Sequence, residues 1–478
     1  MSARPEPLLR LRLAAAVYRF RESLFLLPAL IVVGGVLLAE LGHAVDRAIG
    51  ADRAVPGTLA MSSNTATWLL STVAGAMITT AGVVFSLTVV SLQLASSQFS
   101  PRVMRSFVRD RLSQVVIGLL IATFVYCVLT LRYISADPDS PAPRITLTVA
   151  VGLAVATVLL IVAHLDHLAR GLQVGYVVRA IAAEGREVIE HRQHAGHSPR
   201  ASAEEPRHEG ADTLTVPAPR DGWVTQAPGD RMLAAVPPRT TVRLETRIGA
   251  YIHEGEPLVT VWPVPADTRG VLRRLSATVT VADTRTMQHD VDFAIRQLVD
   301  IGLRALSAAI NDPTTAVEVT LRIGGLLRRL LVCDLPPVVM GGPEGRALVR
   351  PWDLSHEDYI AHGFDQLRQA SVTQPHVVTA LLRVLRMLIT LVQEADRPEH
   401  VPALRRQMQL LLAAVEQQPG LHPEDLDRLR AVASGDDPAD RSRPRQHSRW
   451  NPSAGRHGIG PGDAASRAAS PASSSPSE

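Results

Sequence analysis

Polar side chains recur at every seventh position inside an apolar run of this sequence. Since seven residues are close to two turns of an α-helix, these side chains share one stripe. Hydroxyl and amide groups on such a stripe can hydrogen-bond between packed helices, or they can line a polar path for ions or small solutes. Both interpretations stay open from the sequence. The stripe consists of Thr72, Thr79, Ser86, Gln93 and Ser100.

Small residues accompany the stripe. Gly75, Gly82 and Ser96 each follow one of its members by three positions, which lets a second helix approach closely. No charged residue occurs from Asn64 to Pro101, so the stripe lies in a segment suited to a membrane. A Gln side chain that faced lipid would be costly, and we therefore expect the stripe to face protein or water.

A dense polar turn is the second candidate site. Asn311, Asp312 and Pro313 separate two amphipathic segments, and Asp312 can cap the N–H groups of the helix that Pro313 starts. Because a helix N-terminus also attracts anions, this turn is a candidate anion or partner site as well. His164 and His167 share a helix face and could ligate a metal together with a carboxylate, but no third ligand lies close on that face, so we expect interfacial anchoring or hydrogen bonds to a partner.

Composition excludes several classes of protein. All 49 basic residues are Arg, and a Walker A loop, a Schiff base or attached biotin or lipoate each needs Lys. The net charge of +3 is too small to indicate nucleic-acid binding. Cys127 and Cys333 form no CxxC motif, which suits a reducing compartment. No nucleophile with its base and no metal-ligand set stands out, so we expect no enzyme, cofactor or metal.

Four apolar segments are near or above the roughly 18 to 20 residues that a membrane-spanning helix needs. No convincing cleavage site follows the first segment, so we expect an uncleaved anchor. Arg residues are concentrated between the second and third segments and after the fourth, which predicts that both termini are cytoplasmic. The segments are residues 24–41, 68–95, 112–131 and 145–163, within a transmembrane domain of residues 1–190.

The remainder of the chain changes character three times. Residues 191–216 are polar and His-rich and predict a linker, and residues 217–268 show short strand-like runs with glycines at tight turns. Those turns are similar to the barrel-sandwich fold of biotinyl and lipoyl modules, without the Lys that carries the cofactor there. Residues 269–433 show amphipathic helices, and residues 434–478 predict a disordered tail. The predicted fold class is a four-helix membrane domain followed by a small β barrel-sandwich-like module and an α-helical cytoplasmic domain.

Two stretches together resemble a family of bacterial membrane proteins described only as a domain of unknown function. They are TAGVVFSLTVVSLQLASSQFSPRVMR, which starts at Thr80, and FAIRQLVDIGLRALSAAINDPTTA, which starts at Phe293. The resemblance extends over roughly residues 20–430. It implies a protein of the bacterial inner membrane with four spans and a cytoplasmic domain, and it supplies no activity and no catalytic residues.

The sequence favours a homo-oligomeric membrane protein that conducts or gates small solutes, with the second span lining the path. The alternative is a membrane-anchored scaffold or regulator that recruits a cytoplasmic protein partner, in which the stripe only packs helices. Beyond the lipid bilayer, copies of the same chain are the expected partners. Nucleic acid is not expected to bind.

Overall fold

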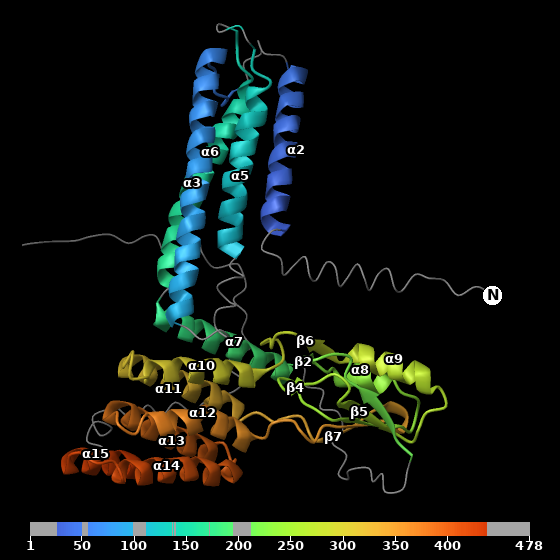
Figure 1. Cartoon of the computed structure of the whole chain (residues 1–478), viewed down its shortest axis with the longest axis vertical. Coiled ribbons are helices and arrows are strands. Elements are labelled where there is room, and N and C mark those ends of the chain that lie inside the picture. The colour runs from blue at the N-terminus through green and yellow to red at the C-terminus, as the bar shows by residue number, and fades with distance from the viewer. Residues whose placement is uncertain are drawn as a thin grey trace, which may run out of the picture.

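Figure 1 shows a bundle of long helices, with a helical domain and a β module side by side beyond one end of it. The predictions for Ser100, for most of the linker and for nearly all of the tail concern residues that lie outside the described part of the chain. The computed structural model describes residues 26–49, 56–98, 111–135, 137, 140–171, 173–194 and 212–436.

The bundle is formed by four apolar helices that pack through small residues. A Cβ atom added at Gly35 of the first helix would lie 3.0 Å from the Cβ atom of Ala122, and one added at Gly118 would lie 2.9 Å from Pro28. Asp46 joins the ends of two helices, because its carboxylate accepts hydrogen bonds from the backbone N–H groups of Ile145 and Thr146. The helices are α2 (Leu26–Ile49), α3 (Ser63–Gln98), α5 (Arg111–Leu131) and α6 (Arg144–Gly171).

Five helices in the described residues are long and apolar enough to cross a membrane by length and composition. Four of them are the bundle helices, each of which contains or closely matches one predicted span. The fifth, α13 (Pro375–Glu394), packs against neighbouring helices of the helical domain. Its apolar side chains therefore form a protein core, in agreement with the amphipathic helix predicted there.

The helical domain has a single apolar core to which the helix after the bundle also belongs. Val178 and Ile189 of α7 (Val174–His194) are buried in this core, and a Cβ atom added at Gly185 would lie 2.9 Å from Ala294. Since α7 packs on α10 and α11, residues 174–190 belong structurally to the helical domain rather than to the bundle. The other helices are α10 (Val291–Ala305), α11 (Pro313–Leu330), α12 (His356–Ala370), α13, α14 (Val401–Glu416) and α15 (Pro423–Ser434).

The β module consists of two sheets, one of five strands in the order β1-β5-β3-β8-β7 and one of three in the order β4-β2-β6. They enclose a core that includes Val224, Val242 and Leu258 and do not join into a closed barrel. Two short helices cover the module, α8 (Gly229–Ala234) and α9 (Thr268–Thr278). The strands are β1 (Leu214–Pro217), β2 (Gly222–Gln226), β3 (Thr241–Leu244), β4 (Tyr251–Ile252), β5 (Pro257–Trp262), β6 (Thr280–Ala282), β7 (Val339–Gly341) and β8 (Ala347–Val349).

The module extends past the predicted limits of residues 217–268. β6 pairs with β2, and the hairpin of β7 and β8 inserts from the helical half so that β8 runs parallel to β3. The helical domain and the β module are therefore linked by strands as well as by the chain between them.

Candidate functional site

The polar stripe of α3 faces away from the rest of the bundle. At about 100° per residue, its described members and the two glycines between them fall within an arc of about 80°. The buried residues of α3 occupy an arc centred about 160° away, where they pack towards α5 and α6. The exposed set is Thr72, Gly75, Thr79, Gly82, Ser86 and Gln93, and the buried set is Ala66, Leu70, Ala74, Met77, Ala81 and Val84.

No other helix of the described chain covers the two glycines. A Cβ atom added at Gly75 or Gly82 would have no neighbouring atom within 4 Å. Thr79 donates a hydrogen bond from its hydroxyl to the Gly75 carbonyl, 2.8 Å away, so it is satisfied within its own helix. The six exposed residues of this set are called the α3 seam below.

Apolar side chains border the seam on both sides. Phe85 is 61 % exposed on one flank and Val83 is 55 % exposed on the other, so the seam is a narrow polar strip in an apolar surface. Gln93 lies near the end of α3 that points towards the helical domain (Figure 1). Its carboxamide has two donors and an acceptor, and it hydrogen-bonds to no other residue of the described chain.

The turn of Asn311, Asp312 and Pro313 is a helix cap. The Asp312 carboxylate accepts hydrogen bonds from the backbone N–H and the hydroxyl of Thr315, and these bonds lower the pKa of Asp312. Asn311 has a φ of 48°, and its side-chain oxygen accepts a hydrogen bond from Gln374 at 3.0 Å. The side chains of this turn are thus engaged within the fold, and an anion or partner site there stays a prediction.

His164 and His167 lie at the end of α6 nearest the helical domain. His164 is buried and His167 is half-buried. In the described part of the chain, no group of three or more His, Cys, Asp and Glu side chains has an arrangement that holds a metal ion.

Comparison with known proteins agrees with this architecture. A family described as "Predicted membrane protein (DUF2254)" matches residues 21–387. The chain belongs to this family. Uncharacterized proteins Mb1321c of Mycobacterium bovis and Rv1290c of Mycobacterium tuberculosis are each 31 % identical over 357 residues, covering 73 % of this chain and 68 % of the relative. No solved structure matches. As a member of the DUF2254 family with four apolar bundle helices, the chain is a multi-pass membrane protein.

The part of the chain that matches the DUF2254 family also holds a buried ionic cluster at the junction of the β module and the helical domain. Arg285 donates to both oxygens of Asp290 at 2.6 and 3.0 Å, and to Asp292 at 2.8 Å. His362 lies 2.6 Å from the other oxygen of Asp292. The guanidinium carbon of Arg285 lies 5.8 Å from the ring centre of Trp223, so β2 also contacts this group. These four charged or titratable residues are called the junction cluster below.

Hydrogen bonds keep Asp292 of the junction cluster charged in spite of its burial. Asp292 is 1 % exposed, and burial alone would raise its pKa. The hydrogen bonds from His362 and Arg285 outweigh that effect and lower the pKa of Asp292 to about 2. Asp290 also caps α10 by accepting a hydrogen bond from the Phe293 N–H. The cluster therefore connects α10 and α12 of the helical domain with β2 of the β module.

Gly249 completes the junction. Its φ of +83° belongs to the left-handed region, and a Cβ atom there would collide with the carboxylate of Asp290 and the guanidinium of Arg285. The turn between β3 and β4 can approach the cluster only because residue 249 has no side chain.

Proposed function

We propose that the protein assembles through the α3 seam into a homo-oligomer in which copies of α3 surround a polar path for small solutes. The observation that carries this proposal is the exposure of the seam on the face of α3 opposite its packed face. Polar side chains within a bilayer characteristically face other helices or water rather than lipid. A second copy of the chain presents the same small and polar strip, which suits close helix packing.

In a closed ring of copies, the polar side chains of every seam contact a neighbouring helix or water rather than lipid. If neighbouring copies meet through different faces of α3 and the rotation that relates them closes, they form a ring in which part of each seam packs against a neighbour and part faces the axis. α3 has 36 residues and is therefore roughly 54 Å long at about 1.5 Å per residue, which exceeds the roughly 30 Å thickness of the hydrocarbon core. Gln93 then lies at the mouth of the path next to the helical domain.

The helical domain is suited to act as the gate. α6 leads into α7 after two residues, and α7 shares the apolar core of the helical domain. Arg179 and Glu190 of α7 form ion pairs with Glu318 and Arg329 of α11. A movement of the helical domain is thus transmitted to the end of α6 rather than absorbed by a long linker.

The orientation that accompanies this function places both termini and the helical domain in the cytoplasm of a bacterial cell. Green fluorescent protein fused after Glu478 tests it, because that protein becomes fluorescent in the cytoplasm and not after export through the general secretion route; a dark but intact fusion would contradict the orientation. The Arg residues that support it are Arg102, Arg105, Arg109, Arg111, Arg170, Arg179 and Arg186.

The test of the proposed function compares two glycines that differ only in position. Gly82→Leu places a large side chain on the seam, whereas Gly152→Leu places the same side chain on α6, where an added Cβ atom also meets nothing within 4 Å. We expect Gly82→Leu to dissociate the oligomer in detergent and Gly152→Leu to leave it intact. Equal behaviour of the two variants would contradict assembly through the seam.

Conduction is tested separately on reconstituted vesicles. We expect Gln93→Leu to change the flux of small ions while the oligomer stays intact, because it removes the amide at the mouth of the path. An assembled protein that shows no flux for any ion or small solute tried would favour the alternative function, a membrane-anchored scaffold.

One observation supports that second function. Trp352 is 55 % exposed and Val338 is 52 % exposed, and both lie next to the β7–β8 hairpin, a surface suited to a protein partner.

A further inference from the structure

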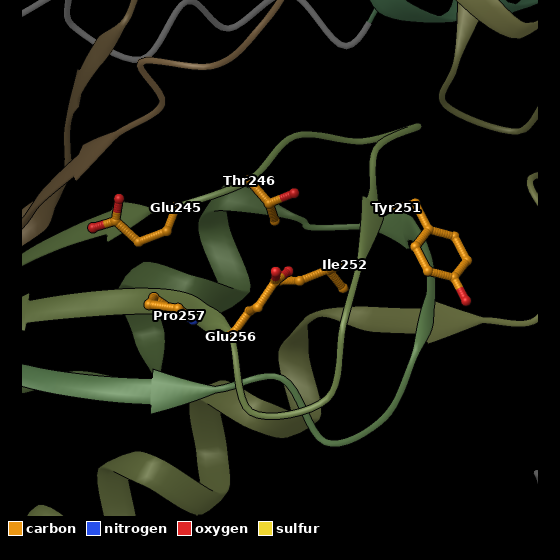
Figure 2. A pocket seen from close by; sticks show the side chains of 6 residues that line it. All are labelled: Glu245, Thr246, Tyr251, Ile252, Glu256 and Pro257. Carbon is orange, nitrogen blue, oxygen red and sulfur yellow. The ribbon is translucent and has the colours of Figure 1, made fainter.

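The β module has a hollow of about 360 Å³ beside the β4–β5 turn. Figure 2 shows the side chains around it: Thr246 lies above Glu256, Tyr251 lies to their right, and the carboxylate of Glu245 points away from them to the left. The volume is within the range of small-ligand sites, roughly 300 to 1,000 Å³. The lining residues are Glu245, Thr246, Tyr251, Ile252, Glu256 and Pro257.

Thr246 is the polar group that points to a ligand. The residue is 8 % exposed, it lines the hollow, and its hydroxyl makes no hydrogen bond to another residue of the described chain. Its hydroxyl is open to the hollow rather than enclosed by protein atoms. Its free acceptor and donor are therefore available to a molecule in the hollow.

Glu256 is held in position by its own turn. One oxygen of its carboxylate accepts a hydrogen bond from the His253 N–H at 2.9 Å, and Gly255 provides the left-handed residue of this turn with a φ of +84°. No cation of the described chain forms an ion pair with Glu256. Its second oxygen is thus an oriented acceptor with a net negative charge.

The remaining walls define the shape and charge of the occupant. Glu245 has a cationic neighbour, Arg243, at 3.5 Å, so its charge is partly balanced. Tyr251 is 48 % exposed and packs its ring edge-on against Trp223, with ring centres 5.4 Å apart, and so forms an aromatic wall. Ile252 is buried and gives an apolar surface. Carboxylate, hydroxyl, aromatic ring and apolar wall together complement an alkylammonium group with a short apolar chain.

We propose that this hollow binds a small primary amine in its protonated form, with the ammonium group held by Glu256 and Thr246. An anion is disfavoured because two carboxylates line the hollow. A metal ion is disfavoured because no group of three or more His, Cys, Asp and Glu side chains in the described chain is arranged to hold one. The site is independent of conduction, and it gives the β module a sensory role whether or not the oligomer forms a path.

Isothermal titration calorimetry on the full chain in detergent tests the proposal, with 1,4-diaminobutane as the probe. We expect saturable binding that weakens as salt is added, and no binding of 1,4-butanediol, which has the same length without charge. Glu256→Gln is expected to weaken binding about tenfold or more, and Thr246→Val by several-fold, because each removes a hydrogen bond to a charged group.

Glu254→Gln is the matched control. Glu254 is an exposed carboxylate two residues from Glu256, and it does not line the hollow. Its variant removes the same charge and is expected to leave the affinity unchanged. Equal weakening by Glu254→Gln and Glu256→Gln, equal binding of the diol, tighter binding of Mg²⁺ than of the amine, or the absence of saturable binding in the folded protein would each overturn the proposal.

Discussion

Asp292→Asn is the perturbation that most directly probes how the two domains are held together. The substitution keeps the size of the side chain and removes a charge that is 1 % exposed. Arg285 is 12 % exposed and would then be left with Asp290 as its one carboxylate partner in the junction cluster. Breaking a buried ion pair costs about 3 to 5 kcal/mol, because the remaining charge stays out of water.

The expected change in melting temperature follows from this cost. For a folded unit of about 150 to 250 residues, 1 kcal/mol corresponds to roughly 2 to 4 °C, so a loss of about 3 kcal/mol lowers the melting temperature by about 6 to 12 °C. Tryptophan fluorescence is a suitable assay, because Trp223 contacts Arg285 in the cluster. Asp427→Asn is the control, since Asp427 is 75 % exposed and pairs with Arg430 on the surface.

Acid should reproduce part of this effect. The pKa of Asp292 is lowered to about 2 from an ordinary value of 3.8, so the folded state favours the charged carboxylate. Its contribution to the free energy of unfolding is complete above pH 3.8 and is lost as the pH falls towards 2. The reasoning would be refuted if Asp292→Asn and Asp427→Asn melted within about 1 °C of each other at neutral pH.

Two further predictions concern the helical domain. Asp312→Ala removes the cap that Thr315 donates to and should lower the free energy of unfolding by about 1 kcal/mol in a denaturant titration, whereas no change would show that the cap is not needed. The rings of His356 and His400 lie with their centres 4.3 Å apart and their planes tilted by 43°, and burial lowers the pKa of both below 6.5. Since unfolding then takes up protons, stability should decline as the pH falls below about 6.5, and replacing both by Gln should flatten that decline. An unchanged slope in the double variant would contradict this assignment.

The helices of the membrane half could be predicted from the sequence because the patterns that indicate them are local. Twenty or so consecutive apolar residues predict a span, and a seven-residue period predicts that polar side chains share a face. In α3, which is long and apolar enough to cross a membrane, Thr72, Thr79, Ser86 and Gln93 lie on one exposed face. The ends were less predictable: α2 continues to Ile49 and α6 to Gly171, because a helix can extend into polar sequence beyond the bilayer.

The β module was less predictable because its sheets depend on distant pairings. β8 lies about a hundred positions after its partner β3, and neither strand is long enough to be recognised by alternation alone. No local pattern showed which sheet the hairpin of β7 and β8 would join. The sequence placed residues 174–190 in the transmembrane domain, whereas α7 packs against the helical domain. Its buried face could not be predicted locally, because α10 and α11, which cover that face, lie far away in the sequence.

The junction cluster was missed although Arg285, Asp290 and Asp292 are close in the sequence. A run of mixed charges usually lies on a solvated surface, and here the decisive partners are His362 and Trp223, which are about 70 positions away on either side. The capping pattern at Asp290, an Asp before an amphipathic helix, was the available signal. This capping pattern predicts where a helix starts, but it does not predict that Asp290 is buried.

The mass of the purified protein in detergent, measured by light scattering with the bound detergent subtracted, tests the central proposal most directly. One chain has a mass of 51.5 kDa. We predict a single species of at least four chains, because that number of α3 helices can enclose a path with their seams. A monomer or a dimer at concentrations where the protein is folded would contradict the proposed path, since too few seams would be present to surround it.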